Sequence, residues 1–367
     1  MKFLIVTLTS WDEAPRARHQ LTQELLKLGH EVYFVEKNSM GFPRIKFHKT
    51  RENFTLISTR FIPGYKFRFR LPIVNEIYQH WLFGRLKARL GDLLVITFDF
   101  TAHKLPAYFS NSVYYCNDEV IGNTTVKSTL VDMYWQRCEK AVATNSMLCI
   151  TTSNYLYCKL FRWNRRVFEI PLGGPDPLSI GPLEKGPKRD KLVLGLVGFI
   201  RDMTISVEVI NELLQEKIFI IRLIGSVGDK FLSKIEHSED IEFLGVLKDQ
   251  ALYNAIAQFD VAIIPYNLEE LNPGATSNKL YLHLACGVPV VMSAIPNLNA
   301  NSFPRGSVYL SEDNSDFSEL VKEAMKQEDP GFVDMRKKFA SQNTWEMRVA
   351  EFMQILKEQG LYEDQEV

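Results

Sequence analysis

The chain has 367 residues, of which 46% are hydrophobic and 24% are charged, and its formal net charge at pH 7 is -1. The length is typical of two domains, and the composition excludes a disordered or fibrous protein. The near-zero net charge gives no reason to expect nucleic acid as a partner. The five cysteines are odd in number and form no Cys-x-x-Cys pair, so we expect a reducing, cytoplasmic compartment.

Alternating strand and helix patterns open the chain. Residues 3–9 are apolar and β-prone and lack the organisation of a signal peptide. Apolar residues at helical spacing follow up to Gly29, and EVYFVE then forms the next strand of a βαβ unit. Further strands are predicted at residues 93–98, 113–116 and 148–152, and a helix around 131–143. We expect these elements to form an α/β domain over residues 1–172.

Residues 173–190 are rich in glycine and proline and form the predicted linker. After the linker, apolar strand patterns alternate strictly with helical patterns. Strands are predicted at residues 192–199, 219–225, 241–245, 260–265 and 289–293, and helices at about 205–216, 229–237, 249–258 and 277–286. Such alternation predicts a doubly wound parallel sheet over residues 191–343, with a ligand crevice at the carboxyl ends of its strands.

The segment from Pro265 to Ser293 joins a polar loop, a short helix and a buried strand. Ser277 is a natural N-cap for the helix, and Gly287 ends it. Free backbone N–H groups and the positive end of the helix dipole favour an anion at such a helix start. Lys279 adds a positive charge in the first turn, where acidic residues are usual. This segment therefore predicts a site for a phosphorylated ligand, and the alternative is ordinary capping with a solvated lysine.

The sequence SNKLYLHLACGVPVV, residues 277–291, resembles the NKLYEYLAAGKPVV signature of GT-B glycosyltransferases of the teichuronic-acid and capsule type, which are related to glycosyltransferase family four. Residues 11–36, 113–122 and 150–160 resemble segments of the same enzymes in the same order. The resemblance covers most of the chain and is strongest after Leu192. It implies two Rossmann-like doubly wound domains that face a central cleft.

In the resembled enzymes a final helix crosses back to pack on the first domain. Residues 344–360 predict such a helix, with Trp345, Val349, Met353 and Leu356 on one face. We expect it to return to the first domain, and the alternative is a helix that merely extends the second domain.

The resemblance implies an enzyme that transfers a sugar from a nucleoside-diphosphate sugar, of the UDP or GDP type, to a glycan or lipid-linked acceptor in surface-polysaccharide assembly. Two positions depart from the pattern, because Gly274 and Leu282 stand where many relatives have glutamates, and the second of these glutamates contacts the donor ribose. One alternative is therefore a catalytically degenerate binding or scaffold protein. The other is an NAD-dependent oxidoreductase, but LGLVGFIRD (residues 194–202) is not the Gly-x-Gly-x-x-Gly fingerprint of dinucleotide-binding folds.

A sugar-nucleotide donor needs positive charge at its diphosphate, contacts for its base and hydrogen bonds for its sugar. Arg201 lies near the place where the resembled enzymes have a basic residue for the leaving diphosphate, and its alternative is a surface arginine paired with Asp202. Tyr266 could stack on the donor, although an aromatic residue after a strand usually belongs to the core. The predicted donor-binding residues are Gly198, Arg201, Gly225, Ser226, Gly245, Val246, Leu247, Tyr266, Thr276, Ser277, Asn278 and Lys279, with Asn272, Gly274 and Ala275 in the loop that faces the sugar.

The predicted catalytic residues are Asp118, Arg201 and Lys279. An inverting reaction needs a base from the first domain, for which Asp118 and Glu119 lead, followed by Asp99 and His19. A retaining reaction, which the resemblance favours, needs no such base, because the leaving phosphate can deprotonate the acceptor. We find no cluster of metal-binding residues, so we expect no cofactor and a metal-independent transfer in which basic side chains and a helix dipole replace the cation. Arg16 and Arg18 are candidates for contacts with substrate, with solvated arginines as the alternative.

Residues 60–72, RFIPGYKFRFRLP, contain four basic residues, several aromatic residues and no acidic residue. Such a segment can make a peripheral contact with the anionic inner face of a membrane or bind a lipid-linked acceptor. The alternative is a basic loop that covers aromatic core residues.

Overall fold

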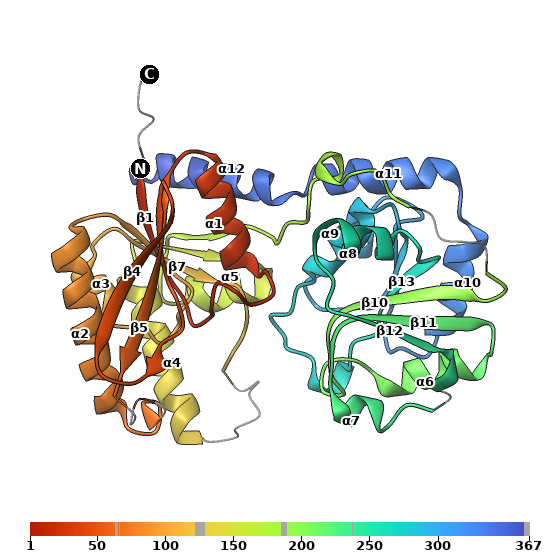
Figure 1. The fold of residues 1–367 in the computed structure, drawn as a ribbon, viewed down its shortest axis with the longest axis horizontal. Helices are drawn as coiled ribbons and strands as arrows, with labels where there is room; N and C mark the ends of the chain where they lie inside the picture. Colours follow the sequence, from red (N-terminus) through yellow and green to blue (C-terminus); the bar gives the residue numbers. More distant parts are fainter. Residues whose placement is uncertain (63–64, 66, 122–128, 185–188, 237, 363–367) are drawn as a thin grey trace. The chain divides into compact units, whose positions relative to one another are not determined.

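The structure is a computed structural model that describes residues 1–62, 65, 67–121, 129–184, 189–236 and 238–362. The chain divides into two compact units, each built around a mostly parallel sheet (Figure 1). Unit 1 comprises Met1–Pro171 and Arg348–Val367, and unit 2 comprises Leu172–Met347. None of the helices within the described ranges is long and apolar enough to cross a membrane.

The sheet of unit 1 has the strand order β3-β5-β2-β1-β6-β7-β8-β9, and β4 pairs with β5 as its antiparallel neighbour. Its strands are β1 (Lys2–Val6), β2 (Glu31–Val35), β3 (Ser39–Met40), β4 (Arg44–Arg51), β5 (Phe54–Phe61), β6 (Leu94–Thr97), β7 (Ser112–Cys116), β8 (Leu148–Thr151) and β9 (Val167–Glu169). The helices are α1 (Ala17–Lys27), α2 (Pro72–Leu90), α3 (Leu105–Tyr108), α4 (Thr129–Asn145), α5 (Asn154–Phe161) and the part of α12 (Trp345–Glu358) from Arg348 onwards.

The sheet of unit 2 is parallel throughout, with the strand order β12-β11-β10-β13-β14-β15. Its strands are β10 (Leu192–Ile200), β11 (Phe219–Val227), β12 (Ile241–Gly245), β13 (Val261–Ile264), β14 (Val290–Ser293) and β15 (Val308–Ser311). The helices are α6 (Val207–Gln215), α7 (Asp229–Leu232), α8 (Asp249–Ile256), α9 (Asn278–Ala285), α10 (Phe317–Lys326) and α11 (Pro330–Ser341).

Strand β10 shows why this sheet is covered on both faces. Leu194 and Leu196 belong to one core cluster with residues of α6 and α10, whereas Val193 and Val197 belong to a second cluster with residues of α8 and α9. Successive side chains of a strand point to opposite faces, so a continuous apolar run fits a sheet with helices on both sides. The predicted fold class, α/β with two doubly wound parallel-sheet domains, is confirmed.

Helix α12 places its apolar residues in the interior. Trp345, Val349, Met353 and Leu356, the predicted inward face, are all buried. Within unit 1 the ring of Phe352 lies 6.3 Å from that of Tyr115, which belongs to β7. The C-terminal part of the helix thus contributes to the core of the unit that begins the chain.

Candidate functional site

Two neighbouring strands of unit 2 carry glycines at their carboxyl ends. Gly198 of β10 pairs with Gly225 of β11, and their φ angles are 130° and 124°. A Cβ atom on Gly225 would lie 2.1 Å from the carbonyl oxygen of Gly198, so no side chain fits there. Gly245 ends the next strand, β12, with a φ of 66°. The predicted phosphate and base contacts therefore fall on bare backbone at adjacent strand ends.

Lys279, in the first turn of α9, reaches this strand edge. A Cβ on Gly198 would lie 2.6 Å from the lysine Cε and 2.8 Å from its Nζ, so the ammonium group lies against the glycine. The side chain is partly buried, and within the described part of the chain it has no ion-pair partner. Loss of hydration lowers the pKa of Lys279 to about 8. An anionic ligand would supply the missing partner.

The start of α9 offers a second polar group. Ser277 precedes the helix as predicted, but its hydroxyl makes no capping hydrogen bond, which corrects the simple capping expectation. The side chain is 4% exposed, and its Oγ has no hydrogen-bond partner among the described residues. The first turn also contains no acidic residue. A buried hydroxyl without a partner is costly, so this helix start is suited to an anion that accepts its hydrogen bond.

His283, one turn after Lys279, is a feature that the sequence reasoning missed. It is fully buried, and neither ring nitrogen has a hydrogen-bond partner in the described ranges. Burial, with the charge of Lys279 as a second cause, lowers its pKa to about 3. His283 is therefore neutral at physiological pH and fills space beneath Lys279 without neutralising it.

The loop before α9 is held in shape by its own polar groups. Asn272 Oδ1 accepts a hydrogen bond from the backbone N–H of Gly274 at 2.8 Å. The side-chain amide of Asn297 donates to the carbonyls of Pro273 and Ala275 at 2.9 and 3.0 Å. These contacts fix the loop that the sequence assigns to the donor sugar. Asn297 was not predicted, because it lies on a different segment and meets the loop only in the folded chain.

Arg201 follows β10 and is exposed. A Cβ on Gly228 would lie 2.8 Å from its Nη1, so the side chain extends toward the residues that follow β11. The alternative pairing with Asp202 is wrong, because that carboxylate pairs with Lys234 at 2.8 Å. Within the described ranges Arg201 has no ion-pair partner. Its charge is therefore available near the end of β10.

The other predicted donor residues have mixed environments. Tyr266 is partly buried and packs against the core cluster of α8 and α9, which favours the core interpretation of its ring. Leu247 packs against the same cluster, whereas Val246 is 64% exposed. Ser226 lies in β11 opposite exposed Phe199. Thr276 and Asn278, on either side of Ser277, are both partly buried.

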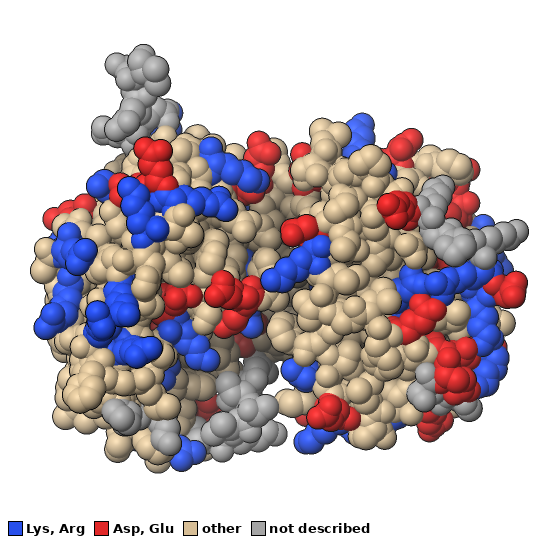
Figure 2. Space-filling model, viewed as in Figure 1, with Lys and Arg blue, Asp and Glu red and all other residues tan. Residues whose placement is uncertain are grey.

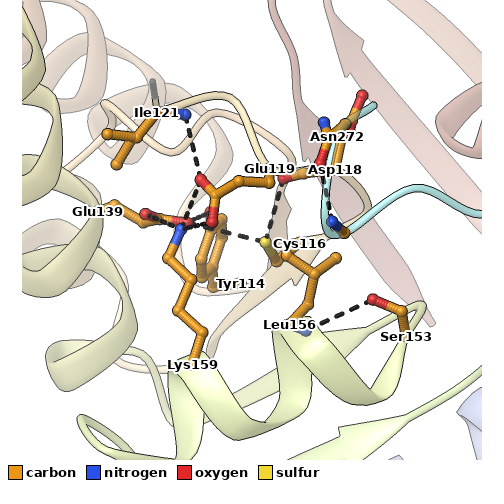
Figure 3. Close-up of polar contacts among 11 residues, drawn as sticks. Tyr114, Cys116, Asp118, Glu119, Ile121, Glu139, Ser153, Leu156, Lys159 and Asn272 are labelled. Carbon is orange, nitrogen blue, oxygen red and sulfur yellow. Dashed lines mark hydrogen bonds and ion pairs between the residues drawn. The ribbon is translucent and has the colours of Figure 1, made fainter. Parts of the chain in front are cut away.

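In unit 1 the loop after β7 separates the two leading base candidates. Asp118 is exposed. Glu119 is buried, and its carboxylate oxygens accept hydrogen bonds from Lys159 at 2.8 and 2.7 Å and from the N–H of Ile121 at 3.1 Å (Figure 3). A carboxylate that is paired in this way is not a free base, so Glu119 anchors the loop and Asp118 remains the candidate.

Lys159 lies between two buried carboxylates (Figure 3). Its Nζ is 2.6 Å from Glu139, which also accepts a hydrogen bond from the Tyr114 hydroxyl at 3.0 Å. Burial raises the pKa of Glu139. Burial opposes the charge of Lys159, but the two carboxylates outweigh it and raise the lysine pKa. The network therefore ties β7, α4 and α5 to the loop that carries Asp118.

The remaining candidates of unit 1 have local partners. Asp99 Oδ1 accepts hydrogen bonds from the N–H and hydroxyl of Thr101 at 2.8 and 2.6 Å, and burial raises its pKa. His19 uses both ring nitrogens, at 3.0 Å from the N–H of Arg16 and 3.1 Å from the carbonyl of Ser10. Both side chains therefore stabilise turns, and neither is a free base.

The two arginines at the start of α1 differ. Arg16 is exposed and lies 3.5 Å from the carboxylate of Glu13, as a solvated arginine would. The solvated interpretation is wrong for Arg18, which is 8% exposed and lies 5.5 Å from the centre of the Phe98 ring. Burial lowers its pKa to about 10. Within the described ranges, no three His, Cys, Asp or Glu side chains come together as metal ligands would.

Part of the chain matches a known protein family. Residues 192–327 match the profile of the family described as Glycosyl transferases group 1. A comparison with curated protein sequences gives no match.

Several solved structures share the fold over nearly the whole chain. Sucrose-phosphate synthase from Thermosynechococcus elongatus has a TM-score of 0.72 and 16% identity, with 98% of this chain and 99% of that chain covered. The alpha,alpha-trehalose-phosphate synthase (UDP-forming) from Burkholderia xenovorans, in complex with glucose-6-phosphate, has a TM-score of 0.70 and 11% identity, with 97% and 100% covered. The Anabaena protein HepE, in complex with UDP, has a TM-score of 0.68 and 13% identity, with 98% and 100% covered.

These structures confirm the predicted fold, and the family match lies on the unit that carries Lys279 and the strand-end glycines. The chain has the two-domain GT-B fold, and its residues 192–327 match the family of group 1 glycosyl transferases.

Proposed function

We propose that this protein is a glycosyltransferase that moves a sugar from a nucleoside-diphosphate sugar, of the UDP or GDP type, to a glycan or lipid-linked acceptor in the assembly of a surface polysaccharide in the cytoplasm. The observation that carries the proposal is the unpaired ammonium group of Lys279 against Gly198, beside the start of α9. Two structural neighbours support it, because one is a complex with UDP and another is a UDP-forming synthase with a phosphorylated sugar.

The diphosphate would bind at the start of α9. Lys279 and the backbone N–H groups of the first turn would hold its oxygens, and the Ser277 hydroxyl would donate a hydrogen bond to it. When the bond between sugar and phosphate breaks, negative charge grows on the departing diphosphate. Lys279 and Arg201 would stabilise that charge, so the transfer would need no metal ion or other cofactor. The neutral state of His283 leaves the lysine charge undiminished.

The nucleoside would lie along the strand ends at Gly225 and Gly245. Backbone at bare glycines can approach a planar base closely, and Ser226 adds a hydroxyl at the same edge. Leu282, at the place of the ribose glutamate, is partly buried against the apolar cluster of α8 and α9. It offers no acceptor for a ribose hydroxyl, so binding energy would come mainly from the diphosphate and the base.

The acceptor would be activated by one of two groups. Asp118 is the exposed carboxylate of the loop after β7 and would take the acceptor proton in an inverting reaction. In a retaining reaction the leaving phosphate would take it. Asp118→Asn separates these routes, because it would reduce kcat by at least about 100-fold only where the carboxylate is the base. The anomeric configuration of the product, read by NMR, gives an independent answer.

The experiment that tests the donor proposal measures binding and turnover together. Thermal shifts with UDP, GDP, TDP, CMP, ADP and NAD would be recorded in EDTA, followed by hydrolysis of the matching nucleotide sugar. We expect one nucleoside diphosphate to stabilise the protein and Lys279→Met to abolish that shift. Lys326→Met, an exposed lysine of α10, is the matched control and should bind as the wild type does. A metal requirement would refute metal independence.

The alternatives predict different results. A nucleotide that binds through Lys279 without hydrolysis or transfer would indicate a degenerate binding or scaffold protein. A shift with NAD alone would indicate an oxidoreductase. If Lys279→Met and Arg201→Met both left nucleotide affinity unchanged, the proposed phosphate site would be wrong.

We also propose that residues 60–72 contribute to a peripheral contact with the inner face of a membrane. Residues 63, 64 and 66 lie outside the described residues. Phe61 and Tyr65 are buried core residues, and the Arg68 guanidinium lies over the rings of Tyr65 and Phe69, at 4.1 and 3.9 Å from their centres. Part of the segment thus covers the core, as the alternative predicts. Its exposed residues include Arg60, Ile62, Phe67, Arg70 and Leu71, which leaves basic and apolar groups for a membrane.

A further inference from the structure

A small apolar surface on unit 1 is exposed to an unusual degree. The residues between β3 and β4 pass the end of β5, where the N–H of Gly41 donates to the carbonyl of Phe61 at 2.7 Å. Met40, Phe42 and Ile62 surround this crossing and are 56%, 94% and 42% exposed. We call these three residues the β3–β4 tip. Single exposed apolar residues are common, but an almost fully exposed phenylalanine beside two further apolar side chains marks a contact surface.

Basic residues flank the tip. Arg44 in β4 lies directly opposite Arg60 in β5, and Lys46 is two residues further along the same face of β4. All three are exposed, and none has an ion-pair partner within the described ranges. Like charges placed directly opposite each other on neighbouring strands repel. The arrangement is therefore expected to favour a negatively charged partner that lies across both strands.

The surrounding sequence reinforces this charge. Residues 37–51 contain five Lys or Arg residues and no Asp or Glu. In Figure 2 lysine and arginine side chains gather on the part of unit 1 that holds β4 and β5. Basic residues on an edge strand also discourage aggregation, but that role does not explain why a phenylalanine is left exposed beside them.

The basic residues and the exposed phenyl ring together indicate which class of partner binds the β3–β4 tip. A second copy of the chain would bring the same positive charges together. An acidic polymer would satisfy the arginines and the lysine but would leave Phe42 in water. A bilayer with anionic lipids satisfies both, because its headgroups attract the basic residues and its interface accepts the phenyl ring.

The position of the tip relates it to the acceptor side of unit 1. In the parallel part of the sheet, β5 and β7 end at the same edge, and they are separated by β2, β1 and β6. Four strand spacings of about 4.8 Å place the end of β5 roughly 19 Å from the end of β7. Asp118 follows β7, so a lipid-linked acceptor held in the bilayer beside the tip would have its sugar within reach of that edge.

We propose that the β3–β4 tip docks the protein on an anionic membrane surface, with Phe42 entering the interface and Arg44, Lys46 and Arg60 contacting lipid headgroups. This proposal makes the membrane contact proposed for residues 60–72 more specific. Its functional role rests on the proposed lipid-linked acceptor. It identifies the residues that reach the lipid.

Co-sedimentation of the full chain with lipid vesicles tests the proposal. We expect binding to phosphatidylcholine vesicles that contain phosphatidylglycerol, weak binding to phosphatidylcholine alone, and release by salt. Arg44→Gln and Lys46→Gln should each lower the partition coefficient about fivefold, and Phe42→Ser should also lower it. The matched controls in unit 2 are Leu178→Ser, at a leucine that is 90% exposed, and Lys326→Gln, and both should bind as the wild type does.

A site-specific probe decides whether the phenyl ring enters the lipid. Tryptophan fluorescence of Phe42→Trp should shift to shorter wavelength with phosphatidylglycerol vesicles and be quenched by brominated acyl chains. Leu178→Trp should show neither change. An unshifted Phe42→Trp would overturn the proposal, and so would wild-type binding that Phe42→Ser leaves intact.

Other results would place the membrane contact on another segment, indicate another class of partner, or bear on the donor proposal alone. Binding that is lost with Phe67→Ser and Arg70→Gln but kept in the tip variants would move the membrane contact to residues 67–72 and refute the tip. Equal binding to an acidic polysaccharide, without a tryptophan shift, would favour a polymer. Nucleotide-induced thermal shifts of the tip variants, measured without vesicles, should equal those of the wild type. A failure of nucleotide binding in the wild type would refute the donor proposal alone.

Discussion

Lys279 and Gly198 are in direct contact, because a Cβ on the glycine would lie 2.6 Å from the lysine Cε and 2.8 Å from its Nζ. The contact joins the first turn of α9 to the end of β10 and exists only because residue 198 has no side chain. It holds a cation at the carboxyl edge of the sheet, where doubly wound folds bind their ligands. The glycine thus sets the position of the charge, and the lysine supplies it.

The first prediction concerns this contact. Gly198→Ala should displace the Lys279 side chain and lower the affinity for a nucleoside diphosphate by at least about tenfold, which equals about 1.4 kcal/mol. The φ angle of 130° adds backbone strain, so we expect a further loss of about 1–3 kcal/mol in the free energy of unfolding. Isothermal titration calorimetry and urea denaturation measure the two effects.

A matched glycine separates strain from contact. Gly29 has a φ of 81°, and a Cβ there would meet nothing within 4 Å. Gly29→Ala should therefore cost stability without any change in nucleotide affinity. Equal affinity in Gly198→Ala and the wild type would show that the lysine position does not depend on this contact.

The second prediction is a pH dependence of donor binding. Burial lowers the pKa of Lys279 to about 8 in the unliganded protein, and a bound diphosphate would raise it again by pairing with the charged form. Affinity should therefore be constant below pH 8 and fall above it, by up to about tenfold for each pH unit, because binding must then add a proton to the lysine. Calorimetry between pH 6.5 and 9.5 measures the profile.

Lys279→Met provides the control for that profile. Its residual affinity should be weak and show no break near pH 8. If the wild type also lacked the break, the lysine would not meet the diphosphate as a titrating cation.

The sequence predicts the strands β10 to β14 of unit 2 well because they are apolar runs that end at turns, although the residues of β12 are only partly buried or exposed. Runs of this kind were found in the sequence at the positions of β10, β11, β12, β13 and β14. The pattern is weaker where only one face is apolar. In β4 only Ile45 and Phe47 pack against the core, and the basic residues between them obscured the alternation. Other elements that were not predicted are the strands β3, β5, β9 and β15 and the helices α2, α3, α10 and α11.

The candidate site is less predictable than the fold. Ser277, Lys279 and Gly198 stand out through local rules of helix starts and strand ends, so their residue types could be chosen from the sequence. Their contact could not, because it depends on how closely α9 approaches β10. Asn297 and His283 were missed for the same reason. The carbonyls that Asn297 binds and the apolar cover of His283 are assembled only by the fold.

The third prediction concerns a buried arginine that supports α9. Arg336 is fully buried and donates hydrogen bonds to the carbonyls of Gly287 at 2.8 Å and Gly306 at 2.6 Å, and it pairs with Glu328. Arg336→Met leaves both carbonyls without partners, so we expect a loss of about 3–5 kcal/mol in the free energy of unfolding. Urea denaturation monitors the loss.

Exposed Arg305 gives the control for this change. Arg305→Met should alter stability by less than about 0.5 kcal/mol. Comparable stability of the two variants would mean that the carbonyls near Arg336 find other partners when the arginine is removed.

The fourth prediction concerns the charges beneath the loop of Asp118. Lys159→Met removes the cation that pairs with the buried carboxylates of Glu119 and Glu139, which should cost about 3–5 kcal/mol at pH 7. Burial already raises the pKa of Glu139, and loss of the lysine charge, which lowers that pKa, would raise it further in the folded chain. A group of this kind favours the folded state below its unfolded pKa and loses that contribution as pH rises.

The loss in free energy of unfolding caused by Lys159→Met, the deficit of the variant, should therefore shrink between pH 7 and pH 5. Urea denaturation at both values checks this, with exposed Lys140→Met as the control, and a deficit that stays constant or grows toward pH 5 would contradict it.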